Sequence, residues 1–206
     1  MQPRQPFLPC LSALVTWARR HLLAFTCALG LAGITLATAE ELSPAARLEY
    51  QVKAGFLVNF GKLTEWPDEH IRAARPFRIC VVDDGEAFKV MAATLQGKFI
   101  KGRPVELVRY DTVPELKDLP PMEILFVTRT RADQGARAVS WLGDAPVVSV
   151  GECPGFAAEG GRINFTLKDQ TVRFEVNLES ATRAKLKISS KMAAMATVVG
   201  GKEGRR

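Results

Sequence analysis

"FRICVVDDGEAFKVMAATL", residues 77–95, is the stretch that decides the fold class of this chain. Its first six residues are a nearly continuous apolar run with β-branched members, which is typical of a strand buried on both faces of a sheet. The acids and the glycine that follow predict a turn, and the remainder predicts a helix. A strand that leads directly into a helix is the repeating unit of α/β folds.

The same alternation of strand and helix continues along the chain. Further strands are expected at 103–110, 123–128 and 145–151, and a helix is expected at 131–142. A short polar turn at 168–170 is then flanked by "GRINFTL" and "TVRFEVNL". Two alternating segments on either side of a short turn predict a β-hairpin, so the sheet should contain antiparallel members as well.

The carboxyl-terminal part of the chain predicts more helix. One helix is expected from about residue 179 and a last one over 191–199, with a break in the pattern near 187–190. We therefore predict a single α/β domain at 40–198 and a flexible tail at 199–206. Its sheet should be mixed but mostly parallel, include the C-terminal β-hairpin, and carry helices on both faces.

A helix is also predicted before the first strand, within "VKAGFLVNFGKLTEWP", residues 52–67. Large apolar residues recur there at helical spacing, and they are expected to pack on the sheet: Val52, Phe56, Phe60 and Leu63. Other apolar residues need not fit under that stripe, and we predict that they contact a partner or a second copy of the chain: Leu57, Val58 and Trp66. Such a stripe could support a homodimer.

The first 39 residues have the features of a secretory signal peptide. A basic, acid-free start precedes a short apolar run, which ends at Ala37-Thr38-Ala39. Cleavage after Ala39 would remove three arginines and lower the formal charge from +6 by three. No compact basic stripe remains in the sequence to indicate nucleic-acid binding. We predict an exported protein.

The usual catalytic sets are missing from the sequence after residue 39. His70 is the single histidine there, so no Ser-His-Asp or Cys-His arrangement can be assembled. Asp83, Asp84 and Glu86 follow the first strand and could hold a divalent cation. The interpretation that we favour is that Asp83 caps the next helix and that the other two acids lie at its N-terminus. No metal or cofactor is predicted.

A second polar cluster lies near the end of the chain. Glu175 is on the hairpin, and Lys187 and Ser189 occupy the break in the helical pattern. Such residues could simply form a solvated surface. Alternatively, they could form a concave site for a small anionic or zwitterionic ligand.

Two cysteines, Cys80 and Cys153, would remain after cleavage. An even number in an exported protein allows a disulfide bond between them. The alternative for Cys80, which lies in an apolar strand, is a buried free thiol.

Six stretches, in this order, resemble the YfiR/HmsC-type family of exported bacterial proteins over about residues 47–198. They are "LEYQVKAGFLVNFGKLTEWP", "FRICVVDDGEAF", "LQGKFIKGRPVEL", "EILFVT", "VVSVGECPGFAAEGGRINFTL" and "VRFEVNLESATRAKLKISSKM". The resemblance implies a periplasmic α/β regulator without enzymatic activity. It also implies an inner-membrane partner, since the best-studied members restrain a diguanylate cyclase through its periplasmic sensing domain. Many members have a cysteine at the position of Met122, so the family's usual disulfide cannot form here.

Three functional hypotheses follow for this chain. The first is a regulator of an inner-membrane signalling protein, most readily a repressor of a diguanylate cyclase in cyclic-di-GMP and biofilm control. The second is a small-molecule receptor or an accessory protein of a sensor histidine kinase. The third, an unrecognised enzyme, would have to use carboxylates such as Asp83 and Asp84 in place of histidine.

Overall fold

The computed structural model describes residues 42–71, 75–113 and 121–200. The predicted signal peptide at 1–39 lies outside these residues, as does most of the predicted tail at 199–206. Within the described ranges, no helix is both long enough and apolar enough to cross a membrane.

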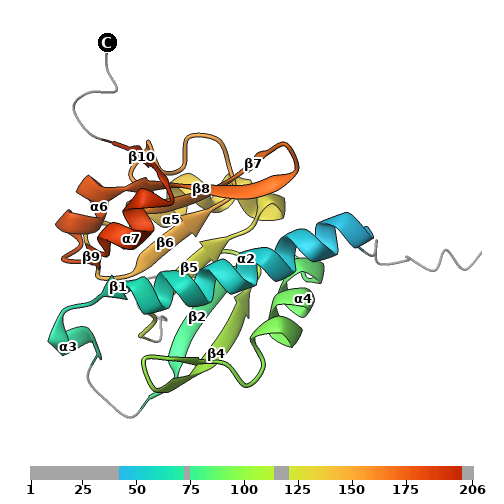
Figure 1. The fold of residues 1–206 in the computed structure, drawn as a ribbon, viewed down its shortest axis with the longest axis horizontal. Helices are drawn as coiled ribbons and strands as arrows, with labels where there is room; N and C mark the ends of the chain where they lie inside the picture. The colour runs from blue at the N-terminus through green and yellow to red at the C-terminus, as the bar shows by residue number, and fades with distance from the viewer. Residues whose placement is uncertain (1–41, 72–74, 114–120, 201–206) are drawn as a thin grey trace, which may run out of the picture. The chain divides into compact units, whose positions relative to one another are not determined.

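The described residues form an eight-stranded sheet in the order β10-β8-β7-β6-β5-β2-β4-β3 (Figure 1). Within this eight-stranded sheet, only the β7·β8 and β3·β4 pairs are antiparallel. The predicted mixed, mostly parallel sheet and its C-terminal hairpin are therefore confirmed. The strands are β2 (Phe77–Val82), β3 (Phe99–Ile100), β4 (Arg103–Tyr110), β5 (Ile124–Val127), β6 (Val148–Gly151), β7 (Ile163–Lys168), β8 (Thr171–Asn177) and β10 (Thr197–Val199).

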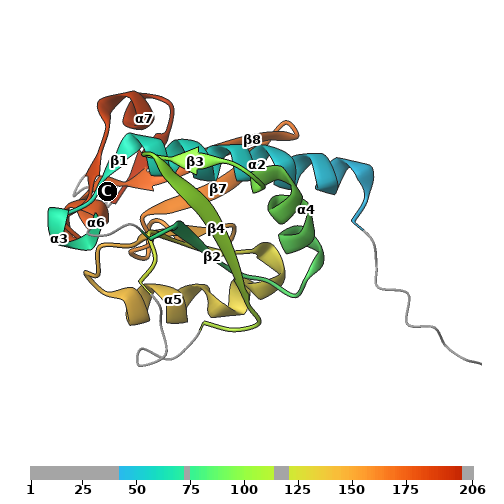
Figure 2. The ribbon, with the colours of Figure 1, turned by 90° about the horizontal axis from the view of Figure 1, so that it is seen from below.

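Helices cover both faces of this sheet, as predicted. In Figure 2, α2 and α4 lie above the sheet and α5 lies below it. A separate two-stranded ladder joins β1 (Thr64–Glu65) to β9 (Lys187–Ile188). The helices are α2 (Pro44–Leu63), α3 (Asp68–Ile71), α4 (Glu86–Leu95), the 3-10 helix η2 (Arg129–Gln134), α5 (Gly135–Leu142), α6 (Leu178–Arg183) and α7 (Ser190–Ala194).

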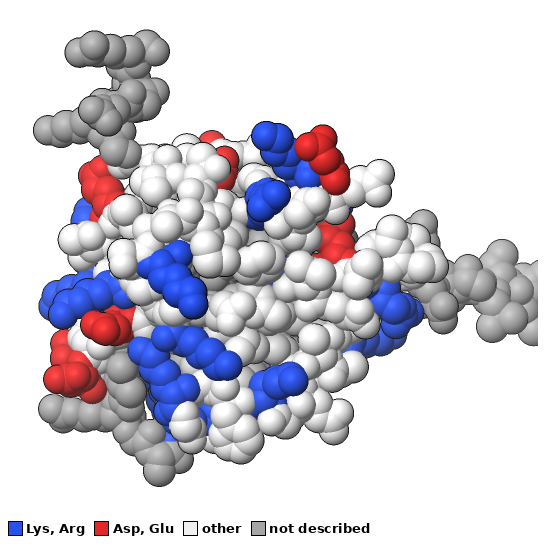
Figure 3. Space-filling model, viewed as in Figure 1, with Lys and Arg blue, Asp and Glu red and all other residues white. Residues whose placement is uncertain are grey.

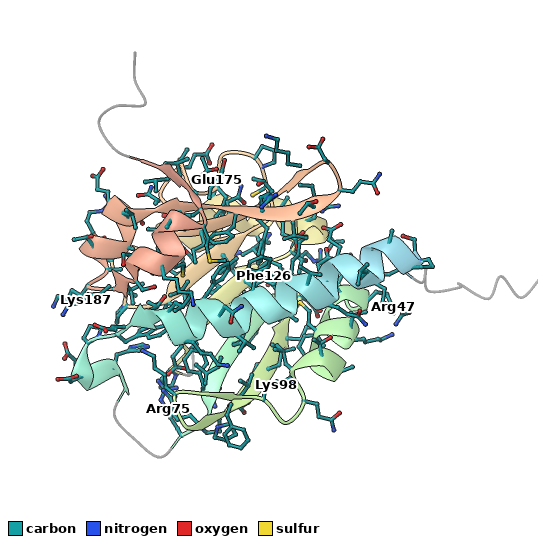
Figure 4. All side chains as sticks on the ribbon, viewed as in Figure 1. Arg47, Arg75, Lys98, Phe126, Glu175 and Lys187 are labelled. Atoms are coloured by element: carbon teal, nitrogen blue, oxygen red, sulfur yellow. The ribbon has the colours of Figure 1, made fainter. Side chains whose placement is uncertain are left out.

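The period of two along each strand divides the core into two layers. On β2, Ile79 and Val81 belong to the cluster beneath α2 and α4, whereas Cys80 and Val82 belong to the cluster that contacts α5. Phe126 of β5, which is labelled near the centre of Figure 4, lies in the first of these clusters. Continuous apolar strands are required because both faces of the sheet are covered.

The buried face of α2 differs from the predicted one. The helix begins as expected, with the Ser43 hydroxyl accepting from the amide of Ala46 and with Pro44 in the first turn. However, its buried residues are Tyr50, Lys53, Ala54, Leu57, Phe60 and Gly61. Val52, which was expected to be in the core, is 41% exposed. The buried stripe is therefore rotated around the helix relative to the stripe of large apolar residues.

Close packing explains this rotation. A Cβ atom on Gly61 would lie 3.0 Å from side-chain atoms of Ile100 and Phe77, so the helix approaches the sheet along its glycine face. The predicted partner contacts at Leu57 and Trp66 are wrong, since both side chains are buried in the core. Trp66 packs edge-on against Phe77, with 5.5 Å between the ring centroids. Val58 is half-buried and packs against the same core cluster.

The predicted helix over 191–199 is only partly correct. A short helix, α7, ends at Ala194, and the chain then forms β10 parallel to β8. Thr197, Val198 and Val199 are β-branched, which favours a strand once the helix has ended. The predicted break near 187–190 contains the two-residue strand β9, after which Ser190 begins α7.

Candidate functional site

A buried ion pair joins α2 to the carboxyl end of β6. The Nζ atom of Lys53 lies 2.5 Å from Oε2 of Glu152, and both side chains are 1% exposed. Lys53 also pairs with Glu49, one turn earlier on the same helix. The lysine side chain runs beneath the ring of Tyr50, with its nitrogen 4.7 Å from the ring centroid. A buried charge requires such partners, because it has lost its hydration.

A second cation closes this network from the adjacent strand. Arg129 begins η2 directly after β5, and its guanidinium lies 2.7 Å from Oε1 of Glu49 and 3.6 Å from Oε2 of Glu152. Burial raises the pKa of Glu152, although Lys53 and Arg129 oppose that rise. Burial also tends to raise the pKa of Glu49, but there the effect of Lys53 and Arg129 is larger and the pKa is lowered. The network thus contains two carboxylates and two cations.

A hollow of about 560 Å³ opens beside this network, and we call it the sheet-edge hollow. It exists because β7 continues to Lys168 after its pairing with β6 has ended at Asn164. The carboxyl ends of parallel strands are where α/β proteins bind ligands. The hollow is lined by Lys53, Arg129, Ala132, Glu152, Cys153, Pro154, Gly155, Asn164, Phe165, Thr166, Leu167 and Glu175.

A second depression, the α2–α7 groove, has an aromatic floor and a volume of about 370 Å³. The rings of Phe56 and Phe60 lie 5.5 and 5.0 Å from the ring of Phe174, measured between centroids. Lys62 and Lys191 lie at its rim. The groove is lined by Phe56, Asn59, Phe60, Lys62, Leu63, Phe174, Lys191, Met192 and Met195.

The surface around the α2–α7 groove is basic. Lysine and arginine side chains gather around α7 and the C-terminal half of α2 in Figure 3. A smaller adjoining depression includes Lys62 again, together with Lys101, Lys187 and one acid, Glu65. An apolar centre with a polar rim is typical of protein interaction surfaces, and positive charge at such a rim favours an acidic partner.

The ligand site predicted from Glu175, Lys187 and Ser189 is not assembled. Glu175 lines the sheet-edge hollow, whereas Lys187 and Ser189 line the depression beside Lys101. Figure 4 shows the separation, with Glu175 on β8 at the top and Lys187 at the left edge. The cause is α6, which carries the chain away from β8. Ser189 instead caps α7, since its hydroxyl accepts from the amide of Met192.

The disulfide between Cys80 and Cys153 that the sequence allowed is absent, and both residues are free cysteines. Cys80 pairs with Leu125, which in turn pairs with Ser149, so β5 separates the two cysteine-bearing segments. Each strand spacing is roughly 4.8 Å, so two spacings separate the segments by roughly 10 Å. A disulfide tolerates a Cα separation of only about 7 Å. Burial raises the pKa of Cys80 to about 12, which keeps it as a thiol.

Asp83 accepts from an amide in the first turn of α4, as the favoured interpretation expected, although the N-cap residue itself is Gly85. Its Oδ2 atom accepts hydrogen bonds from the amides of Gly85 at 2.8 Å and Phe88 at 2.9 Å. Its Oδ1 atom accepts from the hydroxyl of Thr128 at 2.9 Å. The carboxylate is fully buried and engaged in these bonds. Among the described residues, no group of three or more His, Cys, Asp or Glu is arranged to hold a metal ion.

Sequence reasoning missed most of the sheet-edge hollow. Lys53 and Glu152 are 99 residues apart, and no local pattern connects them. A signal was nevertheless present, because Glu49 and Lys53 have the spacing of a helical ion pair. A lysine between Tyr50 and Leu57 on an otherwise apolar face indicates a buried charge with a distant partner.

Fold and sites together define a small mixed α/β domain with an ion-paired hollow at the sheet edge and a basic, apolar groove beside its long helix. The chain belongs to the YfiR/HmsC-like family, whose model matches residues 50–197. The resemblance seen in the sequence is thereby confirmed.

Comparison with other proteins adds little to this assignment. No curated protein matches the chain. An ABC domain in complex with L-Trp from Streptococcus pneumonia has a TM-score of 0.49 at 12% identity, over 71% of this chain and 60% of that one. A conserved domain protein from Vibrio cholerae O1 biovar eltor has a TM-score of 0.46 at 11% identity, over 77% and 61%. The chain thus spans less than two thirds of these structures, and likenesses at this level carry no inference about its function.

Proposed function

We propose that this protein is a periplasmic, non-enzymatic regulator that binds the periplasmic sensing region of an inner-membrane signalling protein and represses a diguanylate cyclase. The observation that carries the proposal is membership of the YfiR/HmsC-like family over residues 50–197. Export by the predicted signal peptide at 1–39 would bring the domain to the required compartment.

The α2–α7 groove is the contact face that we propose for the partner. Its aromatic floor forms a pocket that an apolar anchor residue of a partner could fill. Such anchor residues supply most of the binding free energy of protein interfaces. Lys62 and Lys191 at the rim favour an occupant that places acidic residues beside an apolar segment. We therefore propose that the partner contributes an acidic, apolar segment of its sensing region.

Repression then follows from a difference in affinity. If the regulator binds the inactive state of the cyclase more tightly than the active state, binding shifts the population towards the inactive one. Lowering the active fraction from about one half to about 1% requires roughly a 100-fold preference for the inactive state. Any signal that weakens the contact releases the cyclase.

Affinity capture from detergent-solubilised membranes tests the contact. The wild-type protein should recover an inner-membrane protein that carries a diguanylate cyclase domain, identified by mass spectrometry. The double variant Lys62→Glu, Lys191→Glu should recover at least about tenfold less, because both rim charges are reversed. Lys168→Glu, which is exposed at the end of β7, is the matched control and should behave like wild type.

Three outcomes of the capture are distinguishable. Recovery of a sensor kinase in place of a cyclase would move the output to phosphorylation and contradict the cyclase proposal. Equal recovery by wild type and the double variant would show that the partner binds elsewhere. Failure to recover any inner-membrane signalling protein would contradict the regulatory proposal itself.

A further inference from the structure

The long helix α2 carries an apolar stripe that the rest of the described chain leaves partly open to solvent. Leu48 and Val52 are 60% and 41% exposed. Phe56 and Leu63, further along the helix, are half-buried. At about 100° per residue, these four side chains and Asn59 fall within an arc of about 80° on the helix surface. No charged residue lies on this arc, which we call the α2 stripe, whereas the solvent face of a surface helix is normally charged or polar.

The α2 stripe leads directly into the α2–α7 groove. Phe56, Asn59 and Leu63 line that groove. Val52 lies one helical turn before Phe56, and Leu48 lies two turns before it. The fifteen residues from Leu48 to Leu63 span about 22 Å along the helix axis, at 1.5 Å per residue. The apolar surface is therefore elongated, and it fits a linear segment of a partner.

A helix is the form of segment that suits this surface. The stripe lies on a helix, whose interior amides and carbonyls are already paired with one another, so it offers no backbone hydrogen bonds to an incoming strand. An extended segment would lose hydration at its own backbone groups without gaining partners for them. An amphipathic helix pairs its own backbone and presents apolar side chains at helical spacing, which is how helices bind apolar grooves.

The charge beside the stripe is more positive at the end that lies in the groove. Lys62 and Lys191 line the groove, and Figure 3 shows other basic side chains gathered around it. Glu49 lies beside the other end, but two cations already pair with it. Arg47 precedes Leu48 but lies about 100° away from it around the helix. The surface therefore favours a helix whose acidic residues are concentrated at the end that meets Lys62.

We propose that the partner segment in the α2–α7 groove is an amphipathic helix of about four turns that also covers the α2 stripe. Its acidic residues lie beside Lys62 and Lys191. The helix buries Leu48 and Val52, which the groove itself does not include. Because this helix belongs to the proposed inner-membrane partner, the inference rests on the proposed function.

Photo-crosslinking in the host cell tests both the contact and the conformation. A photoreactive amino acid replaces Leu48 in one variant and Asn59 in another, and mass spectrometry identifies the partner residues that each one captures. The two captured sites should lie about 11 residues apart in one segment of the partner if that segment is helical. An extended segment would place them about five residues apart. The same amino acid at Ser140, exposed on α5 across the sheet from α2 (Figure 2), is the control and should capture no residue of that partner.

A double variant measures what the stripe contributes to binding. Leu48→Gln, Val52→Gln changes two exposed side chains, so the protein should fold as the wild type does, and thermal unfolding checks this. In affinity capture from detergent-solubilised membranes it should recover at least about tenfold less partner, because two apolar contacts are lost. Ala136→Gln, at an exposed position of α5, is the matched control and should leave recovery unchanged.

The outcomes separate this inference from the proposed function. Captured sites about five residues apart, or in unrelated segments, would contradict the helix. Capture at Asn59 alone, with wild-type recovery by the double variant, would confine the partner to the groove and overturn the inference while the proposed function stands. Crosslinks at Leu48 to a second copy of the chain would assign the stripe to a dimer contact instead. Failure of both positions to capture any inner-membrane signalling protein would contradict the proposed function as well.

Discussion

Replacing Lys53 with methionine should destabilise the protein by about 3–5 kcal/mol at pH 7, because the change leaves a buried carboxylate without its main partner. The side chains of Lys53 and Glu152 are each 1% exposed. The cation that remains beside Glu152 is Arg129, at 3.6 Å, and its side chain is 55% exposed. Since that contact is longer and screened by solvent, it should recover only a small part of the loss.

The size of this loss should depend on pH. Burial already raises the pKa of Glu152, and removal of Lys53, which opposes the rise, should raise it further. A carboxyl group with a higher pKa in the folded state binds more protons when folded. Stability therefore falls as the pH rises from the unfolded value of 4.5 towards the folded one. Lys53→Met should be least destabilising near pH 4.5 and most destabilising at pH 7.

Urea denaturation at both pH values measures the effect, and a double-mutant cycle isolates the pair. Glu152→Gln removes the charge that Lys53 neutralises, so the double variant should be more stable than the sum of the single losses predicts, by at least about 2 kcal/mol. Lys62→Met, at an exposed position of the same helix, should change stability by no more than about 0.5 kcal/mol. A loss below about 1 kcal/mol for Lys53→Met, or an additive cycle, would refute the reasoning.

Three further predictions concern the core and the thiols. Gly61→Ala should destabilise the protein by about 1–3 kcal/mol, because the added Cβ atom would crowd side chains of the sheet. Gly55→Ala, on the same helix, has open space around the added Cβ atom and should stabilise the protein by about 0.5–1 kcal/mol. Thermal or urea unfolding measures both changes, and equal effects would contradict the packing of α2. Phe60→Ala should cost about 3–5 kcal/mol in the same assay, and a loss below about 1 kcal/mol would remove this ring from the core. A thiol reagent should modify the half-buried Cys153 in the native protein and reach Cys80 only after unfolding. Thiols that appear in the unfolded protein only after reduction would contradict the two free cysteines.

The order of the elements could be predicted from the sequence because each buried strand is a short apolar run between turns. The strand at 77–82 was placed at its observed bounds, and so was the one at 103–110. The hairpin followed from its polar turn at 168–170. These are local signals, and they survive in the fold because tertiary packing agrees with them.

The face of α2 could not be predicted by counting large apolar residues. Gly61 and Ala54 are buried because they are small and allow close approach, a property that hydrophobic periodicity does not register. Lys53 is buried because of an acid 99 residues away. Leu57 consequently lies in the core. The spacing of Val52 and Phe56 had predicted instead that Leu57 would lie outside the buried face of the helix.

The sites depended on long-range geometry to an even greater degree. Glu175 and Lys187 are close in sequence, but α6 lies between them and places them in different depressions. Glu175 instead meets Asn164 across the hairpin. Proximity along the chain predicted a single site, whereas strand register determines which side chains meet.

The level of cyclic-di-GMP in cells tests the central proposal most directly. Deletion of the gene should raise it, and expression of the wild-type protein should restore the original level. The Lys62→Glu, Lys191→Glu variant should be exported and folded but should fail to restore that level, while Lys168→Glu should succeed. A cyclic-di-GMP level that deletion leaves unchanged would contradict the proposed repression of a diguanylate cyclase.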